Sequence, residues 1–295
     1  MKTKALLGLT TGAIALATAC STGETVANSS ETETIQLGQV GLSFYAVTGG
    51  VVQELLERDG YTVEVTEGSH AEIFPMLGDG EVDILAATWL PTGHAALYEP
   101  VEDVTFQIAP LYEDARFFWV VPSYVPEEEV SSLEDLTKPE VQSRLPAEII
   151  SLPEETGLTI SAREVVSTYG LDEAGYELVA GSQSEWLSSF ETAVEAGDWV
   201  VFPLWQPQWV NAAYEVRALE PMEAYGEPDT AYLLGHEDLE AKLSPEALTR
   251  LSNVRLSVEA VTEMDRLVNA EGLSPREAAR SWLDENQETV ADWGY

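Results

Sequence analysis

The chain has few of the residues that serve as nucleophiles, metal ligands or phosphate contacts. Its 295 residues include one cysteine, three histidines and 14 lysines and arginines, against 52 aspartates and glutamates. The resulting net charge of −38 at pH 7 repels nucleic-acid phosphates and anionic lipid headgroups. We therefore expect no nucleic acid among the partners of this protein.

Catalytic and metal-binding motifs are also scarce. The three histidines, His70, His94 and His236, do not have the spacing of metal ligands. The chain contains neither a Gly-x-Ser-x-Gly motif nor a Gly-rich phosphate loop followed by lysine, and its single cysteine excludes an internal disulfide bond. We expect no catalytic residues, no metal site and no cofactor, and hence no enzyme.

Long apolar runs are missing after the first twenty residues. Lys2 and Lys4 precede the apolar stretch 5–19, which is too short to span a bilayer comfortably, and Cys20 follows small residues. This pattern resembles a bacterial lipoprotein signal and predicts removal of the signal peptide 1–19, with Cys20 as the lipid acceptor. A secretory peptide followed by an unused cysteine is the alternative.

Residues 20–34 are rich in Ser, Thr and Glu and contain almost nothing to bury, which predicts a flexible tether. No later segment approaches eighteen unbroken apolar residues, so we expect the lipid to be the only membrane anchor. The folded part is therefore expected to be extracytoplasmic, in the periplasm or at the outer face of the cell membrane.

The rest of the chain has the composition and the pattern of an α/β protein. A hydrophobic fraction of 45% is too high for a disordered acidic chain, and short apolar strands alternate with amphipathic helices. Ser131 and Glu134 have the spacing of a capping box, and Ser244 and Ser274 each precede a proline, as at helix starts. Strands are expected at 35–40, 62–65, 82–87, 117–122, 148–152, 176–179 and 199–202, and helices near 51–59, 72–77, 133–136, 160–169 and 186–196.

Two successive α/β units predict two lobes. We expect lobe 1 at 35–119 and 207–295 and lobe 2 at 120–206, joined by two crossover strands. In such a protein a ligand binds in the cleft between the lobes, where closure buries it on both sides.

Tryptophans fall where this cleft would lie. Trp89 follows the expected strand 82–87, and Trp205 and Trp209 follow the second crossover. The carboxyl end of a strand is where α/β folds place ligand contacts. Indole faces attract cations without neutralising them, and a quaternary ammonium has no N–H to donate, so these residues predict an aromatic cage. Packing of each indole within its own lobe is the alternative.

A second feature precedes the expected helix at Ile160. The backbone amides of Gly157 and Leu158 would be unpaired donors of a helix N-terminus, which can bind an anion, and Gly157 lets the backbone approach closely. An ordinary capping turn is the alternative.

Four runs resemble those of the glycine betaine (OpuAC-type) substrate-binding proteins of ABC importers, and the similarity extends from about Ile35 to about Leu283. The runs are Gly80-Glu81-Val82-Asp83-Ile84, Thr88-Trp89-Leu90-Pro91-Thr92-Gly93-His94, Pro153-Glu154-Glu155-Thr156-Gly157-Leu158 and Leu204-Trp205-Gln206-Pro207-Gln208-Trp209. The Trp-Leu-Pro and Trp-x-Pro-x-Trp runs are the specific ones, because Gly-Glu-Val-Asp is common in solute-binding proteins.

The resemblance implies a type II periplasmic-binding-protein fold and a receptor for a small zwitterionic ligand. By position, Trp89 and Trp205 match cage tryptophans, and Gly157 and Leu158 match the amides that bind the ligand carboxylate. It also implies an ABC permease with a separate ATPase subunit as partners. We expect the receptor to act as a monomer.

This chain departs from the family at Gln208, where many members have histidine; a glutamine amide can still donate to a carboxylate. Phe44 and Tyr45, expected in the loop after the first strand, are candidate cage walls, with core packing as the alternative for Phe44. His94 is expected to face solvent, with the cleft as the alternative.

The expected ligand is glycine betaine or a related quaternary ammonium or sulfonium osmolyte. Choline and dimethylsulfoniopropionate remain alternatives, because their headgroups differ little from the viewpoint of the cage. A sensory or adhesive lipoprotein of the same fold without an importer, and an extracytoplasmic hydrolase, are the alternatives from other functional classes.

Overall fold

The computed structural model describes residues 33–295. The predicted signal peptide 1–19 and lipid acceptor Cys20 lie outside the described residues, as does the predicted tether up to residue 32. The first strand, β1 (Thr34–Val40), begins almost at once in the described part.

A seven-stranded mixed sheet forms the centre of the fold. Its order is β2-β1-β3-β9-β4-β7, and β8 pairs with β4. β1 is parallel to β2 and β3, whereas β9 is antiparallel to both of its neighbours, β3 and β4. The strands are β2 (Thr62–Gly68), β3 (Ile84–Leu90), β4 (Thr105–Pro122), β7 (Phe202–Gln206), β8 (Val216–Ala218) and β9 (Asp229–His236).

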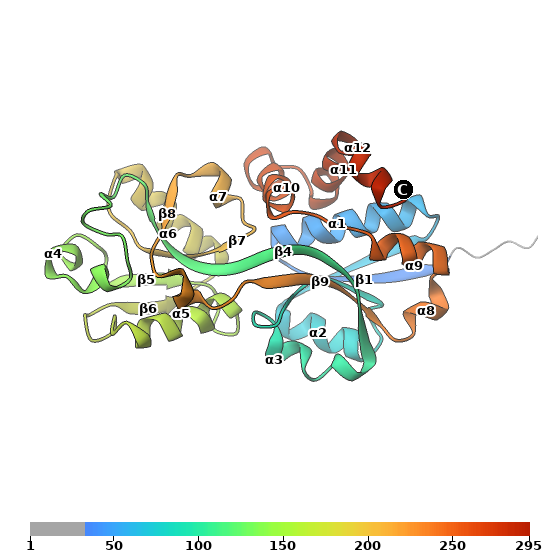
Figure 1. Ribbon diagram of the computed structural model, residues 1–295, viewed down its shortest axis with the longest axis horizontal. Helices are drawn as coiled ribbons and strands as arrows, with labels where there is room; N and C mark the ends of the chain where they lie inside the picture. Colours follow the sequence, from blue (N-terminus) through green and yellow to red (C-terminus); the bar gives the residue numbers. More distant parts are fainter. Residues whose placement is uncertain (1–32) are drawn as a thin grey trace, which may run out of the picture. The chain divides into compact units, whose positions relative to one another are not determined.

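One long strand connects the two lobes. The first part of the 18-residue strand β4 pairs with β9, and its last part pairs with β7 and β8. Figure 1 shows β4 running from the group of elements around β1 to the group around β5 (Glu148–Ser151) and β6 (Glu177–Ala180), which form a separate parallel pair. The two-lobed α/β fold is therefore confirmed.

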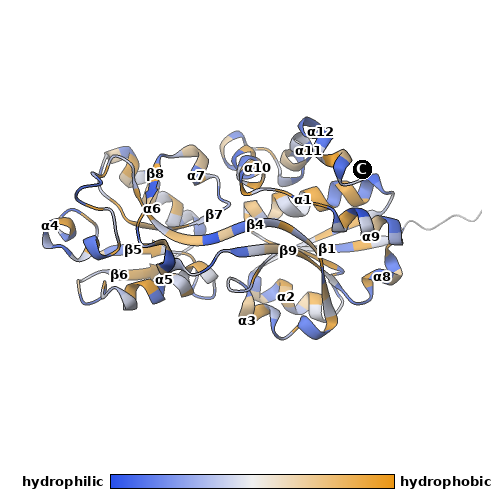
Figure 2. Cartoon of the chain, in the orientation of Figure 1, coloured by the Kyte–Doolittle hydropathy of each residue, from blue (hydrophilic) through white to orange (hydrophobic). Residues whose placement is uncertain are grey.

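The division of the lobes at 119/120 and 206/207 stays a prediction. β8, which follows residue 207, lies beside β4 at Val120–Pro122. Glu113 and Asp114, in the middle of β4, are exposed, and Figure 2 shows this stretch as hydrophilic between hydrophobic stretches of the same strand.

Helices cover the strands of both lobes (Figure 1). In the lobe of β1 they are α1 (Ser43–Arg58), α2 (His70–Gly78), α3 (Ala95–Tyr98), α8 (Leu239–Lys242), α9 (Pro245–Ser252), α10 (Val258–Glu271), α11 (Pro275–Glu285) and α12 (Gln287–Asp292). Around β5 and β7 they are α4 (Pro139–Gln142), α5 (Gly157–Thr168), α6 (Gln183–Ala196) and α7 (Val210–Ala213). Short 3-10 helices occupy Glu102–Val104, Glu134–Thr137 and Met222–Tyr225.

Helix starts follow their local sequence in most places. The hydroxyl oxygens of Ser244 and Ser274 accept backbone N–H groups three residues on, as the Ser-Pro pairs predict. The capping box expected from Ser131 and Glu134 is wrong, because the carboxylate of Asp135 accepts the backbone N–H of Ser131 instead. The same carboxylate also accepts the hydroxyl of Ser131 and the backbone N–H of Ser132.

Element boundaries differ from the prediction where strands pair over long distances. β3 extends to Leu90, so Trp89 lies within a strand and opposite Ala231 of β9. β7 is displaced towards Trp205, which lies opposite Phe117 of β4. Phe44 and Tyr45 belong to the first turn of α1, not to a loop. Backbone hydrogen bonds to strands that are distant in the sequence extend β3 and β7. The local hydrophobic pattern does not indicate these bonds.

Candidate functional site

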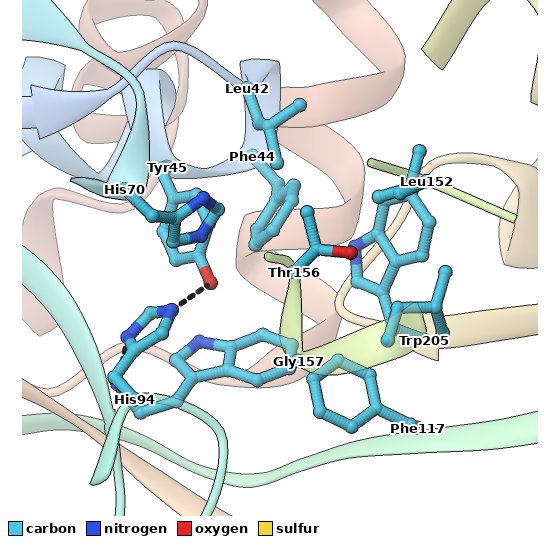
Figure 3. Close-up of a pocket in the computed structure, with 12 residues that line it drawn as sticks. Leu42, Phe44, Tyr45, His70, His94, Phe117, Leu152, Thr156, Gly157 and Trp205 are labelled. Atoms are coloured by element: carbon cyan, nitrogen blue, oxygen red, sulfur yellow. Dashed lines mark hydrogen bonds between the residues drawn. The ribbon is translucent and has the colours of Figure 1, made fainter. Parts of the chain in front are cut away.

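A pocket gathers most of the predicted site residues between the first turn of α1, strands β3, β4 and β7, and the start of α5 (Figure 3). Its empty space is about 290 Å³, including the opening to solvent. It is lined by Leu42, Phe44, Tyr45, His70, Trp89, His94, Phe117, Leu152, Thr156, Gly157, Leu158 and Trp205. Ring systems therefore make up much of its wall.

The aromatic walls surround the pocket from both lobes. The ring centroid of Phe44 lies 5.8 Å from that of Trp89 and 5.7 Å from that of Trp205. The rings of Trp89 and Phe117 are 5.4 Å apart, and those of Tyr45 and Trp89 are 6.0 Å apart. Trp205 is supported from behind by Trp186, an α6 residue, at 4.7 Å. The five of these rings that line the pocket, which exclude Trp186, form an aromatic cluster that can surround a cation.

Strand irregularity and hydrogen bonds set the direction of Trp89. The pairing of β3 with β9 shifts register between Leu85 and Thr88, and Ala87 has a φ of 66°, in the left-handed region. A bulge of this kind re-aims the following side chain. The indole Nε1–H of Trp89 donates to the hydroxyl of Tyr112 at 2.9 Å, so the ring is held from its far edge.

The loop after Trp89 is held by Asp229, the first residue of β9. Its carboxylate accepts the backbone N–H of Thr92 at 2.6 Å, the hydroxyl of Thr92 at 2.8 Å and the N–H of Gly93 at 2.8 Å. Asp229 is buried, and these three bonds satisfy it. The loop therefore has a fixed position beside the pocket.

His94 lines the pocket and is 4% exposed, so the expectation that it faces solvent is wrong. The backbone N–H of Trp89 donates to its Nδ1 at 2.9 Å, and its Nε2 lies 3.2 Å from the hydroxyl of Tyr45 (Figure 3). Burial, together with the neighbouring ring of His70, holds the pKa of His94 well below its usual value. The imidazole is therefore neutral.

The start of α5 offers unpaired backbone donors. Thr156 is the N-cap, and its side chain accepts the N–H of Thr159. Within residues 33–295, the N–H groups of Gly157 and Leu158 have no acceptor. Helix N-termini favour anions through such donors.

A further unpaired donor belongs to the aromatic cluster. The indole Nε1–H of Trp205 is buried and has no partner in the described part of the chain. Buried donors without partners are rare in folded proteins, so each one at a pocket indicates a group that a ligand or water can satisfy.

The pocket contains no ionised side chain at neutral pH. Neither a carboxylate nor a lysine or arginine is among its lining residues. Burial lowers the pKa of His70, which is 9% exposed, to about 4, although the carboxylate of Glu155 acts in the opposite direction. The site thus combines neutral aromatic faces with N–H donors.

Six of the seven predicted ligand-binding residues line this pocket: Phe44, Tyr45, Trp89, Gly157, Leu158 and Trp205. Gln208 is not brought there; it is 1% exposed, and its Oε1 accepts the N–H of Val210. In this structure the Gln208 side chain is therefore not positioned to contact a ligand in the pocket.

Sequence reasoning gave no site role to Leu42, His70, Phe117, Leu152 and Thr156. Phe117 is brought to the pocket by lying opposite Trp205 across the β4–β7 pair. His70 is placed there as the first residue of α2, beside the ring of His94 at 5.0 Å. Only the position of Thr156, directly before Gly157 and the helix, was visible in the sequence as a capping signal.

In the described residues, 33–295, no cluster of three or more His, Cys, Asp or Glu side chains could bind a metal ion. The helices of this part are all too short or too polar to cross a membrane.

Comparison with known proteins decides the family. The model of the substrate-binding domain of ABC-type glycine betaine transport systems, OpuAC, matches residues 33–285. The chain belongs to this family. Members of the OpuAC family are solute-binding components of transport systems and not enzymes, and such components of ABC importers are extracytoplasmic.

One curated relative supports the same assignment. The glycine betaine/carnitine transport binding protein GbuC of Listeria monocytogenes is 25% identical over 138 residues. This match covers 46% of the present chain and 45% of GbuC, so the chain spans less than half the length of that relative.

Solved structures share the fold. The glycine betaine/L-proline-binding protein ProX from Borrelia burgdorferi is 24% identical, with a TM-score of 0.77 over 88% of this chain and 96% of its own. Lactococcal OpuAC, closed on glycine betaine, is 22% identical with a TM-score of 0.77, over 88% and 99% of the two chains. A choline-binding protein in complex with choline is 20% identical with a TM-score of 0.75, over 88% and 91%. The periplasmic-binding-protein fold implied by the sequence is thus confirmed.

Proposed function

We propose that this protein is a lipid-anchored extracytoplasmic receptor that binds glycine betaine or a closely related osmolyte and delivers it to an ABC permease. Membership in the OpuAC family supports the transport role. The lipid anchor at Cys20 and the partnership with a permease and a separate ATPase subunit are parts of this proposal.

The observation that carries the proposal is the chemistry of the pocket wall. The ring faces of Phe44, Trp89, Phe117 and Trp205 can hold a trimethylammonium group, each contributing about 0.5–2 kcal/mol according to its desolvation. The free amides at the start of α5 can accept a carboxylate on the same ligand. A zwitterion with a quaternary cation and an anionic end satisfies both.

Choline is the second candidate, because it carries the same trimethylammonium group and one fold relative is a choline-binding protein. Choline has a hydroxyl in place of the carboxylate. It would leave the N–H groups of Gly157 and Leu158 facing a weaker acceptor, and no carboxylate lines the pocket to balance its charge. The geometry therefore favours betaine over choline.

Dimethylsulfoniopropionate has the same combination of onium cation and carboxylate, and the pocket supports it by the same contacts. A sensory lipoprotein of this fold without an importer would bind the same ligands. Transport of bound ligand by cells that express the permease and ATPase separates a receptor for import from a sensor.

Calorimetric titration with glycine betaine, dimethylsulfoniopropionate, choline and tetramethylammonium tests the ligand assignment. We expect betaine to bind at least about tenfold more tightly than choline, because hydrogen bonds to a charged group contribute roughly 1.5–3 kcal/mol. This preference should be nearly the same at pH 6 and pH 8. Choline binding as tightly as betaine would show that the start of α5 is a helix cap only.

A further inference from the structure

We propose that the hydroxyl of Tyr45 donates a hydrogen bond to the anionic group of the ligand, and that His94 is the positioning residue that orients this hydroxyl. The inference rests on the proposed function and adds a polar contact from the lobe of β1, opposite the amides of α5. It gives Tyr45 a role beyond that of an aromatic wall.

The hydrogen bonds of His94 fix which nitrogen carries its proton. A backbone N–H can only donate, so the 2.9 Å bond from Trp89 requires an unprotonated Nδ1. The neutral ring then carries its proton on Nε2, which donates to the oxygen of Tyr45 at 3.2 Å. Both ring nitrogens are thereby used, and His94 has no atom left to donate to a ligand.

The consequence falls on Tyr45. Its oxygen accepts from His94, so its own proton must be donated elsewhere, and among residues 33–295 the hydroxyl makes no second hydrogen bond. Tyr45 is 3% exposed and lines the pocket, and burial keeps the pKa of its hydroxyl well above the usual value, so the proton stays on. A buried donor without an acceptor is unfavourable until a bound group satisfies it.

The anionic end of the ligand is a group that can accept this proton. A Cβ built on Gly157 would lie 3.0 Å from the carbonyl oxygen of Gly93, the residue before His94, so the start of α5 touches the segment that orients Tyr45. A carboxylate has two oxygens and several lone pairs. One oxygen can accept the amides of Gly157 and Leu158, and the other can accept Tyr45.

This arrangement makes the anion a bridge between the lobes. Tyr45 belongs to α1, and Gly157 and Leu158 belong to α5 in the other lobe; all three line the pocket. The ligands that gain most affinity from this arrangement have an onium cation and a group with two acceptor oxygens. A single hydroxyl, as in choline, cannot serve both sides fully.

Tyr45→Phe tests the contact because it removes the hydroxyl and keeps the ring. We expect it to weaken glycine betaine binding about tenfold or more, and to leave tetramethylammonium binding unchanged, since that cation has no acceptor. Tyr176→Phe is the matched control: Tyr176 is also buried and donates to the carbonyl of Leu136, away from the pocket. It should change neither affinity.

The role of His94 has its own readout. Nitrogen NMR of the folded protein should show His94 neutral with the proton on Nε2 between pH 6 and pH 8. His94→Gln, whose amide can still donate to Tyr45, should retain more of the preference for betaine over tetramethylammonium than His94→Leu. A proton on Nδ1, or equal preference in both variants, would overturn the positioning role.

The outcomes separate the two proposals. If the unsubstituted protein does not bind betaine, the proposed function fails and this inference fails with it. If betaine binds and Tyr45→Phe binds it equally well, or if Tyr45→Phe weakens betaine and tetramethylammonium to the same extent, the inference alone is overturned.

Discussion

Substitution of Gly157 by alanine should prevent tight closure around the ligand. A Cβ at this position would lie 2.9 Å from Cζ of Phe117 and 3.0 Å from the carbonyl oxygen of Gly93. The Phe117 ring can turn away, but Gly93 is backbone, and its loop is held by the carboxylate of Asp229. The lobes would therefore have to separate slightly at this contact.

The magnitude follows from the cost of overpacking. Forcing one methyl group into a well-packed site costs roughly 1–3 kcal/mol, which corresponds to about five- to 150-fold in affinity. The backbone of Gly157 is not in the left-handed region, so alanine itself is not strained there. At the first position of α5 it should change the free energy of unfolding without ligand by no more than about 1 kcal/mol.

Titration calorimetry with glycine betaine, together with denaturant unfolding of the free protein, measures both quantities. Gly68→Ala is the matched control, because Gly68 lies at the end of β2 and its nearest neighbour, Cβ of Glu72, is at an ordinary 3.4 Å. Gly68→Ala should bind like the unsubstituted protein. A Gly157→Ala protein with unchanged betaine affinity would refute the close approach of the two lobes at this residue.

Two further predictions concern Trp89 and His70. Trp89 is 1% exposed and hydrogen-bonded to Tyr112, so Trp89→Ala should reduce the free energy of unfolding by roughly 3–5 kcal/mol. Trp89→Phe should retain the fold and weaken betaine binding by roughly 0.5–1 kcal/mol. Unfolding curves measure the first effect and calorimetry the second, and an unaltered betaine affinity in Trp89→Phe would show that the indole does not contact the ligand. Burial lowers the pKa of His70 from about 6.5 in the unfolded chain to about 4 in the folded protein. Between these pH values the unfolded chain binds more protons than the folded one. The free energy of unfolding therefore falls as the pH falls, by about 1.4 kcal/mol per pH unit. His70→Gln should lose this part of the slope in urea unfolding at pH 4.5, 5.5 and 6.5, and an unchanged slope would contradict the burial argument.

Local sequence was sufficient for the parts of the site that depend on short-range signals. Gly157 before an amphipathic helix already predicts free amides at a helix start, because an N-terminus leaves its first donors unpaired wherever the helix lies. Trp89 and Trp205 were predicted because each follows an expected strand in a run that resembles the family's, and because indole faces attract cations. The alternation of short strands and helices likewise predicted the α/β class, since each period reports which face is buried.

Other features depended on contacts between residues far apart in the chain. Phe117 enters the pocket because the register of β4 and β7 sets it opposite Trp205, and Gln208 is absent from it because its side chain bonds to Val210. His94 is buried between Trp89 and Tyr45, and this burial keeps its imidazole neutral. Its hydrogen bonds with the N–H of Trp89 and the hydroxyl of Tyr45 leave the proton of Tyr45 free to be donated to another group. A sequence specifies which donors and rings exist, but strand register and packing decide which of them share one cavity. In the proposed function, that sharing is what allows the rings and the donors to act on a single ligand.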